Sequence, residues 1–270
     1  MVKELLFPHK SADAPCITVF IHGTQRFVKL IPRSLKKIYD RIVHKDGFYN
    51  IEELPSSYYY RSMMQTMQEG SPSLFQSKHL YVFCWPGTLH HEARTKAAHD
   101  LNTYLKNLTD HYKTHYKSYT LTIITHSHGG NVALNLAAFA NEHSYHIDTL
   151  ILLAAPVQVT TETFVNHALF KKIYALHSHW DLLQVLDPQK LYATSNQSKT
   201  FFSKRHYDNS SVMHISIIDS KIGINRGITH VEFLLSRFMK QLGTIITTAP
   251  IQNSTQSDFI FDLNTQQFQQ

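Results

Sequence analysis

TLTIITHSHGGNVALNLAAF, residues 120–139, joins a run of β-branched apolar residues to a stretch with helical spacing. Between the two lies a short cluster of small and polar residues with Ser127 at its centre. In a parallel sheet, ligands collect at the carboxyl ends of the strands, where the chain leaves for a helix. The segment therefore predicts that Ser127 lies at such a strand end. The structural alternative is an ordinary helix cap made by Ser127 or Asn131.

Apolar runs of strand type recur along the chain. They occupy residues 17–22, 80–85, 121–125, 149–153, 172–177 and 213–218. Segments with helical spacing lie between most of them, for example at 91–108 and 131–142. Near-continuous apolar strands that alternate with helices indicate a parallel sheet covered on both faces. We therefore expect an α/β fold, with a mostly parallel sheet of about six core strands and helices on both faces.

The length and composition set the domain organisation. The chain has 270 residues, of which 43% are hydrophobic, enough to bury one large core. We expect one α/β domain over residues 1–243, with a large insertion at 24–79 after the first core strand. Residues 244–270 are rich in Thr, Gln, Asn and Ser. We expect this tail to be flexible, with the apolar patch DFIFDL as an alternative edge strand.

Charge and apolar runs limit the compartment and the partners. No run approaches the ~20 apolar residues that a membrane span needs, and the first residues lack the apolar core of a secretory signal. We therefore expect a cytoplasmic protein. The net charge of +6 fits an anionic surface, but no dense lysine or arginine block indicates nucleic-acid binding. Cys16 and Cys84 lie at opposite ends of two neighbouring predicted strands, so we expect free thiols.

The order strand, T-H-S-H-G-G, helix around Ser127 resembles the nucleophile elbow of the α/β-hydrolases. Gly129 and Gly130 leave room for the helix and the strand to cross closely. Thr125 stands where the family has its first glycine, a position that needs a small residue. The resemblance covers residues 17–243. It implies a serine nucleophile, followed along the chain by an acid and then a histidine, with an oxyanion hole and no cofactor.

The acid of this order should leave the end of a later strand. Asp181 lies a few residues beyond the run 172–177, and apolar residues that would fix its loop follow it. Asp187 is the alternative acid. It lies farther from the strand and directly before Pro188, where a turn residue is typical.

The base should follow the last strand and precede the last helix. His230 lies between the run 213–218 and an apolar helical pattern over residues 231–242. His206 and His214 are the alternatives, but His206 precedes that strand and His214 falls inside it. The resemblance thus implies Ser127, Asp181 and His230 as the catalytic set.

The oxyanion hole should combine the backbone N–H after the nucleophile with one from the loop after the first strand. That loop reads FIHGTQ, residues 20–25, and resembles the His-Gly pair of lipases and esterases. The resemblance implies the N–H groups of Thr24 and His128 as donors. His22 and Gly23 would then shape the turn, while a plain strand-ending turn is the structural alternative.

A histidine-rich composition invites a metal site. The chain has 19 histidines, including HH at 90–91 and HSH at 126–128 and 177–179. It has no HExxH or CxxC, and histidines two apart on a turn need a further ligand to hold one ion. We therefore expect no metal.

The insertion carries a concentration of positive charge. Residues 24–49 contain seven Lys or Arg against two Asp, a local charge of +5. Apolar residues recur at helical spacing over 35–42, followed by Tyr58, Tyr59 and Tyr60 and then by Met63, Met64 and Met67. One interpretation is a helix packed on the body. The other is a lid or docking surface that faces anionic lipid and borders the site entrance.

Together these features favour a serine hydrolase of carboxylic esters, lipase- or esterase-like, that acts on an acyl ester substrate such as a lipid. A thioesterase or protein deacylase could use the same residues. A hydrolase-fold binding protein without turnover is the alternative from another class.

Overall fold

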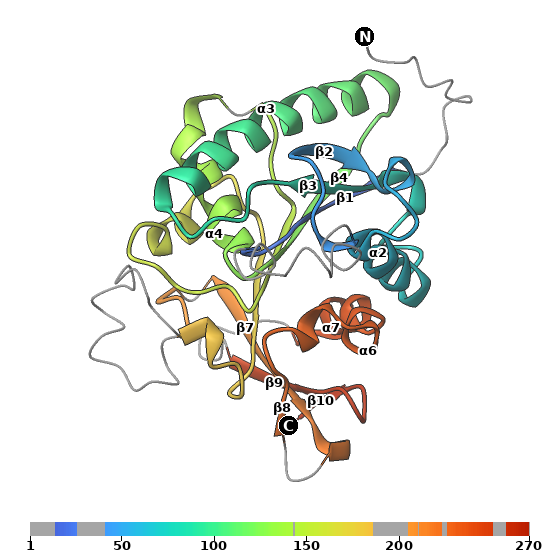
Figure 1. Ribbon diagram of the computed structural model, residues 1–270, viewed down its shortest axis with the longest axis vertical. Coiled ribbons are helices and arrows are strands. Elements are labelled where there is room, and N and C mark those ends of the chain that lie inside the picture. Colours follow the sequence, from blue (N-terminus) through green and yellow to red (C-terminus); the bar gives the residue numbers. More distant parts are fainter. Residues whose placement is uncertain are drawn as a thin grey trace, which may run out of the picture.

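The computed structural model describes residues 14–25, 41–142, 144–185, 205–209, 211–222, 226–250 and 258–269. Over these ranges the chain is organised around one sheet of ten strands (Figure 1). The order across the sheet is β10-β9-β7-β6-β5-β4-β1-β3-β2, and β8 pairs with β7.

Six strands coincide with the apolar runs of the sequence. They are β1 (Cys16–Ile21), β3 (Leu80–Cys84), β4 (Thr120–His126), β5 (Thr149–Leu153), β6 (Ile173–His177) and β7 (Val212–Asp219). Each pairs with its neighbours among the six in parallel, so their carboxyl ends meet at one edge of the sheet. The expected α/β fold with a mostly parallel sheet is therefore confirmed.

Four short strands extend this parallel centre. They are β2 (Gly47–Asn50), β8 (Arg226–Gly227), β9 (Asp258–Asp262) and β10 (Gln267–Phe268). β2 pairs with β3, β8 with β7 and β10 with β9, all antiparallel. β9 pairs in parallel with β7, so the apolar patch of the C-terminal tail adds a strand to the sheet.

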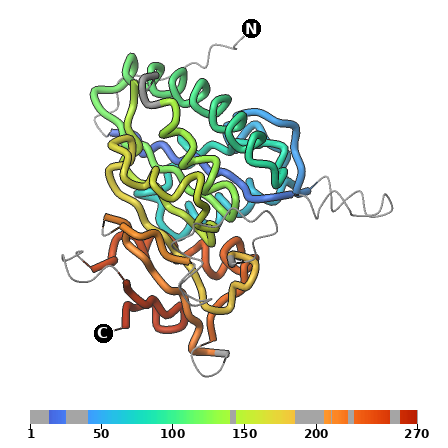
Figure 2. The backbone as a smooth tube through the Cα atoms, turned by 90° about the vertical axis from the view of Figure 1, so that its left-hand side faces the viewer, coloured from blue at the N-terminus to red at the C-terminus, as the bar shows by residue number. Residues whose placement is uncertain are grey.

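Helices cover both faces of the sheet, as Figures 1 and 2 show. One face carries α3 (His91–His115), α4 (Gly129–Leu134) and η5 (Asn135–Glu142), and the other carries α2 (Tyr59–Gly70), α6 (Ser236–Met239) and α7 (Leu242–Thr248). Because side chains alternate along a strand, Val19 packs with the first group and Phe20 with the second. The strands β9 and β10 lie at the end of the molecule opposite α3 in both views.

Single turns of 3-10 helix connect these elements. They are η3 (Ile51–Glu53), η4 (Ser77–His79), η6 (Glu162–Asn166), η7 (Leu183–Val185), η9 (Ser220–Ile222) and η10 (Glu232–Leu234). Only η6 lies between β5 and β6, so the segment that joins these strands is short.

The described part of the insertion belongs to the core. Tyr58, Tyr60, Met63, Met64 and Met67 are at most 5% exposed and pack against the sheet beneath α2. These side chains therefore contribute to the hydrophobic core. The expected basic helix over residues 35–42 falls, except for its last two residues, outside the described part of the chain.

The expectation of one apolar helix over residues 231–242 is wrong. The chain instead forms η10, α6 and α7 in succession. Leu235 has extended backbone angles, φ −78° and ψ 153°, which interrupt any helix through it. The Glu232 carboxylate also accepts hydrogen bonds from the Thr229 N–H and hydroxyl, at 2.6 and 2.7 Å, and so closes a tight turn. Local contacts of this turn prevail over the helical spacing.

Cys16 and Cys84 are free thiols, as expected, although they lie on the paired strands β1 and β3. Among the residues that the structure describes, no helix has the length and apolar character to cross a membrane.

Candidate active site

Ser127 follows β4 in a sharp turn. Its φ of 53° lies in the left-handed region, which a residue with a Cβ rarely adopts. Two hydrogen bonds hold the turn: the Ser127 N–H donates to Leu153 O, and Ser127 O accepts from the Gly130 N–H, both at 2.9 Å. A buried, strained backbone therefore presents this side chain at the carboxyl edge of the sheet.

Small residues let α4 approach the strands beneath this turn. A Cβ added to Gly129 would lie 2.5 Å from Ile21 O, and one added to Gly130 would lie 2.6 Å from Ala155 Cβ. Both positions therefore require glycine. Thr125, which replaces the family's first glycine, is fully buried and donates its hydroxyl to Ile151 O at 3.3 Å. The threonine thus fits because its hydroxyl has a partner on the neighbouring strand.

Asp181 and His230 meet across the same edge. Asp181 Oδ2 lies 2.8 Å from His230 Nδ1, and the exposed fractions of the two side chains are 0% and 12%. The other carboxylate oxygen of Asp181 accepts the Gln184 N–H at 3.1 Å. The His230 carbonyl oxygen accepts a hydrogen bond from His126 Nε2 at 2.9 Å, which ties the base loop to the end of β4. The acid and the base predicted from the sequence are therefore brought together.

The contact between Ser127 and His230 is looser. Within the described part of the chain no hydrogen bond joins Ser127 Oγ to His230. The imidazole of His230 is nevertheless close to the elbow, because its ring centroid lies 4.5 Å from that of His126, the residue before Ser127. Such hydrogen bonds are often long without substrate and shorten when it binds.

The alternative residues lie elsewhere or outside the described ranges. His206 and His214 both face Asp258 of β9, at 3.3 and 3.7 Å. His214 also accepts the Tyr207 N–H at its Nε2. Asp187 lies outside the described residues, so the structure does not place it.

The loop after β1 packs directly against Ser127. A Cβ added to Gly23 would lie 2.7 Å from Ser127 Cβ, so only glycine fits there. The N–H groups of Thr24 and His128 donate no hydrogen bond to any described residue. Two backbone N–H groups beside the serine thus have no acceptor among the described residues, and such an arrangement can bind an anionic oxygen.

His22 fixes the orientation of this loop. Its Nδ1 lies 2.8 Å from Gly23 O, and its Nε2 lies 3.2 Å from the Trp85 N–H. Because a carbonyl only accepts and an N–H only donates, both contacts are satisfied by the neutral ring with its proton on Nδ1. The C=O of Gly23 and the N–H of Thr24 belong to one planar peptide, so His22 sets the direction of that N–H.

Trp85 completes this support. Its Nε1 donates to His22 O at 2.8 Å, and its ring lies nearly parallel to the His22 ring, with centroids 5.9 Å apart. Burial lowers the pKa of His22 to about 4. The His22 ring is therefore neutral at neutral pH, as its hydrogen bonds require.

The histidines on either side of Ser127 are also held neutral. Burial, with a smaller effect of Arg94 and His230, lowers the pKa of His128 to about 3. Burial and then His230 hold the pKa of His126 well below its usual value. His230 differs from these three histidines because it is bonded to the buried carboxylate of Asp181.

Arg205 is a further residue of the site, and no pattern in the sequence predicts it. Its side chain is 1% exposed, and Nη2 donates to the carbonyl oxygen of Asp181 at 2.6 Å. The guanidinium thus anchors the acid loop from a distance of 24 residues along the chain. No local pattern marks such a contact, because it depends on how two distant loops meet.

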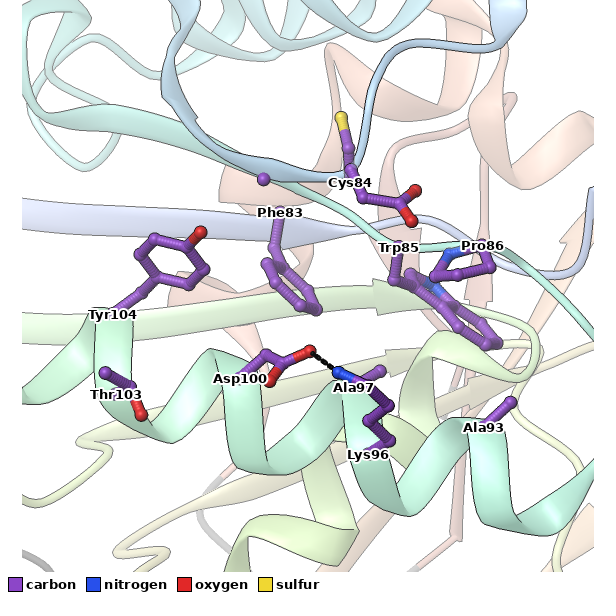
Figure 3. Close-up of a pocket in the computed structure, with 12 residues that line it drawn as sticks. Phe83, Cys84, Trp85, Pro86, Ala93, Lys96, Ala97, Asp100, Thr103 and Tyr104 are labelled. Atoms are coloured by element: carbon purple, nitrogen blue, oxygen red, sulfur yellow. Dashed lines mark hydrogen bonds and ion pairs between the residues drawn. The ribbon is translucent and has the colours of Figure 1, made fainter.

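A cavity of about 410 Å³ lies beside this site, between α3 and the end of β3 (Figure 3). Phe83 and Trp85 line it from the end of β3, and α3 contributes Tyr104 and the ion pair of Lys96 and Asp100. None of the candidate site residues lines it, but Trp85 contributes both to its wall and to the support of His22. The described residues contain no group of three or more His, Cys, Asp or Glu that could hold a metal ion.

Comparisons with known proteins place the chain among known folds. The family model described as "PGAP1-like alpha/beta domain" matches residues 87–255, more than half of the chain. This match includes Ser127, Asp181 and His230 but not the loop after β1. No curated protein matches the chain.

Several solved structures have a similar fold. An esterase of Pyrococcus furiosus is 12% identical, with 86% of this chain and 81% of that chain covered and a TM-score of 0.46. An alpha-beta serine hydrolase homologue from Coxiella burnetii is 14% identical, with 89% of each chain covered and a TM-score of 0.44. The esterase domain of a Rhodothermus marinus protein is 10% identical, with 86% and 84% covered and a TM-score of 0.39. Likeness at this level has no bearing on the activity of this chain.

Proposed function

The chain belongs to the PGAP1-like alpha/beta domain family within the α/β-hydrolase superfamily, and on this premise we propose that it is a serine hydrolase of carboxylic esters. One observation carries the proposal: Asp181 Oδ2 lies 2.8 Å from His230 Nδ1 at the sheet edge where Ser127 adopts φ 53°. A buried carboxylate on one ring nitrogen leaves the other nitrogen to act as a base toward the serine.

The reaction follows from these positions. His230 Nε2 takes the proton of Ser127 Oγ as the oxygen attacks the ester carbonyl carbon. Asp181 holds the ring and stabilises the imidazolium, and the N–H groups of Thr24 and His128 bind the negative oxygen of the tetrahedral intermediate. His230 then gives the proton to the departing alcohol. Water repeats the sequence on the acyl-serine ester and releases the acid.

The neutral histidines support this assignment. Because His22, His126 and His128 have lowered pKa values, none adds a second positive charge beside His230 at neutral pH. Such a charge would disfavour the imidazolium that the reaction forms. The same machinery would serve a thioester or an acylated protein, and the choice among these acyl substrates belongs to the pocket rather than to the three residues.

Labelling and turnover test the proposal together. We expect wild-type protein to be labelled by a fluorophosphonate and to hydrolyse p-nitrophenyl acetate. Ser127→Ala should lose the label and lower turnover by at least ~10³-fold, because in this mechanism Ser127 Oγ is the atom that forms the acyl ester. Ser62→Ala, which changes an exposed serine on α2, is the matched control and should behave as wild type. If the wild-type protein shows no labelling and no turnover, the result would instead assign a binding role without catalysis.

A further inference from the structure

One arginine lies between the two loops that carry the candidate acid and base. Arg226 belongs to β8, the two-residue strand that pairs with the end of β7. The acid loop, residues 178–182, follows β6, and the base loop, residues 228–232, follows β8. The Arg226 side chain is 25% exposed, so most of it is packed against its neighbours. These neighbours belong to both loops.

On the acid side, Arg226 lies against Trp180, the residue before Asp181. The guanidinium carbon is 5.7 Å from the centroid of the Trp180 ring, within the range of a cation–π contact. The next residue of β8 packs on the same loop, because a Cβ added to Gly227 would lie 2.8 Å from Trp180 Cδ1 and 3.1 Å from Trp180 N. Both residues of β8 therefore contact the acid loop.

On the base side, Arg226 forms an ion pair with Glu232. The Nη2 of Arg226 donates to both carboxylate oxygens, at 3.1 and 3.3 Å. The same carboxylate accepts hydrogen bonds from the Thr229 N–H and hydroxyl, at 2.6 and 2.7 Å. Thr229 directly precedes His230, so Glu232 fixes the turn that carries the base. Arg226 thus reaches the base loop through one intervening carboxylate.

These contacts form a closed circuit around the acid and the base. Its members, in order, are Trp180, Asp181, His230, Thr229, Glu232 and Arg226. The hydrogen bond between Asp181 Oδ2 and His230 Nδ1, at 2.8 Å, is one contact of this circuit, so its geometry depends on the others. A reacting group that is misplaced by about 1 Å can cost ~10²-fold in rate. The contacts of Arg226 therefore bear on the alignment of the pair.

We propose that Arg226 is a positioning residue, which holds the acid loop and the base loop at the spacing where Asp181 contacts His230. Arginine suits this place because its planar guanidinium stacks on an aromatic ring and donates to a carboxylate at the same time. The link between the loops stands on the described contacts alone, whereas its effect on turnover rests on the proposed hydrolase function. It also gives Trp180, which is 56% exposed, a role as the platform for the guanidinium.

Turnover of substituted proteins tests this role. Arg226→Gln removes the charge and should lower kcat for p-nitrophenyl acetate about tenfold with little change in KM, because the base is then held less firmly in place. Arg226→Lys keeps the ion pair but lacks the planar fork, and it should recover part of the loss. Arg237→Gln, which breaks the Arg237–Asp219 ion pair, is the matched control and should lower the melting temperature without lowering kcat. Full kcat in Arg226→Gln, or the same loss in Arg237→Gln, would overturn the positioning role.

A double-mutant cycle shows whether the two contacts of Arg226 act together. Trp180→Leu removes the aromatic ring and should lower kcat about threefold, the effect of an exposed cation–π contact. In protein that already carries Arg226→Gln, the same substitution should have no further effect on kcat. Losses that multiply independently would overturn the proposal. A Trp180→Leu variant with a raised KM and unchanged kcat would assign the ring to substrate binding, which also overturns it.

A measurement without turnover keeps this inference separate from the proposed function. The proton on His230 Nδ1, which is shared with the Asp181 carboxylate, should give a far-downfield signal in proton NMR. Arg226→Gln should shift or broaden this signal, whereas Arg237→Gln should leave it as in the wild type. That result in a protein that hydrolyses no ester would keep the positioning role and refute the hydrolase. An unchanged signal in Arg226→Gln would overturn the positioning role, even where the wild type hydrolyses esters rapidly.

Discussion

The two sides of the candidate site are built in opposite ways. On the oxyanion side, His22 and Trp85 are at most 2% exposed, and each nitrogen of the His22 ring has a partner. On the acid and base side, Asp181 is equally buried, but its neighbours Trp180 and Leu182 are more than half exposed. In the proposed mechanism, backbone donors must be fixed before the charge develops, whereas a surface that receives substrate must be open. The difference teaches that rigidity belongs to the side of His22 and Trp85, and exposure to the side of Asp181 and His230.

The largest expected loss of kcat follows from a substitution on the acid and base side, at Asp181. Asp181→Asn should lower kcat by ~10³–10⁴-fold, because an amide no longer holds the His230 tautomer or stabilises the imidazolium. The measurement is steady-state hydrolysis of p-nitrophenyl acetate, with circular dichroism as the check on folding. Asp110→Asn, which changes an exposed carboxylate of α3, is the control and should retain wild-type kcat. An Asp181→Asn variant with full activity would assign the acid to another residue, with Asp187 the first to test.

A smaller effect is expected from the oxyanion side. His22→Phe removes the hydrogen bond that orients the Gly23–Thr24 peptide and should lower kcat by ~10²-fold with little change in KM, since the loss of one oxyanion donor costs about this much. His22→Asn keeps a donor toward Gly23 O and should recover part of the loss. Equal activity in the two variants would show that His22 acts only through packing.

The burial of His22 should make the free energy of unfolding depend on pH in the acid range. The pKa of His22 is about 4 in the folded protein, against about 6.5 in an unfolded chain. Between pH 6.5 and pH 4, the His22 ring therefore takes up a proton when the protein unfolds. The free energy of unfolding should fall as the pH is lowered through this window and be independent of His22 above it. His128 and His126, whose pKa values are also lowered, act in the same direction.

Urea unfolding at pH 7.5 and pH 5 measures this contribution. From pH 7.5 to pH 5, the free energy of unfolding should fall by about 2 kcal/mol less in His22→Phe than in the wild type, because the phenyl ring takes up no proton. His146→Phe, which changes an exposed histidine, should follow the wild type. A His22→Phe variant with the full pH dependence would place the proton uptake on other groups.

The smallest effect is expected where the two sides meet on β4. Thr125→Gly restores the family's first glycine but removes the hydroxyl bond to Ile151 O and frees the backbone. It should lower the free energy of unfolding by ~1–2 kcal/mol and leave kcat nearly unchanged. The measurement is urea unfolding beside the p-nitrophenyl acetate assay. A large loss of kcat would mean that the threonine takes part in shaping the elbow.

Much of this site could be predicted from local sequence. The six core strands are continuous apolar runs, and such runs are legible because a strand buried on both faces needs apolar residues at every position. The placement of Asp181 and His230 followed from where two of those strands end. Their contact at 2.8 Å agrees with that placement, because neighbouring parallel strands bring their carboxyl ends together.

The tertiary structure decided what depends on contacts between distant segments. The helical spacing of 231–242 predicted one helix. In the structure, Leu235 and the Glu232 turn interrupt it, because hydrogen bonds within a folded loop outweigh a weak helical preference. The tautomer of His22 follows from partners on two different loops. The apolar run 80–85 predicts a buried Trp85, whereas the exposure of Trp180 depends on how its loop is placed. Sequence by itself thus determined the strands and the order of the site residues, whereas burial and hydrogen-bond partners, which arise only when loops meet, determined their state.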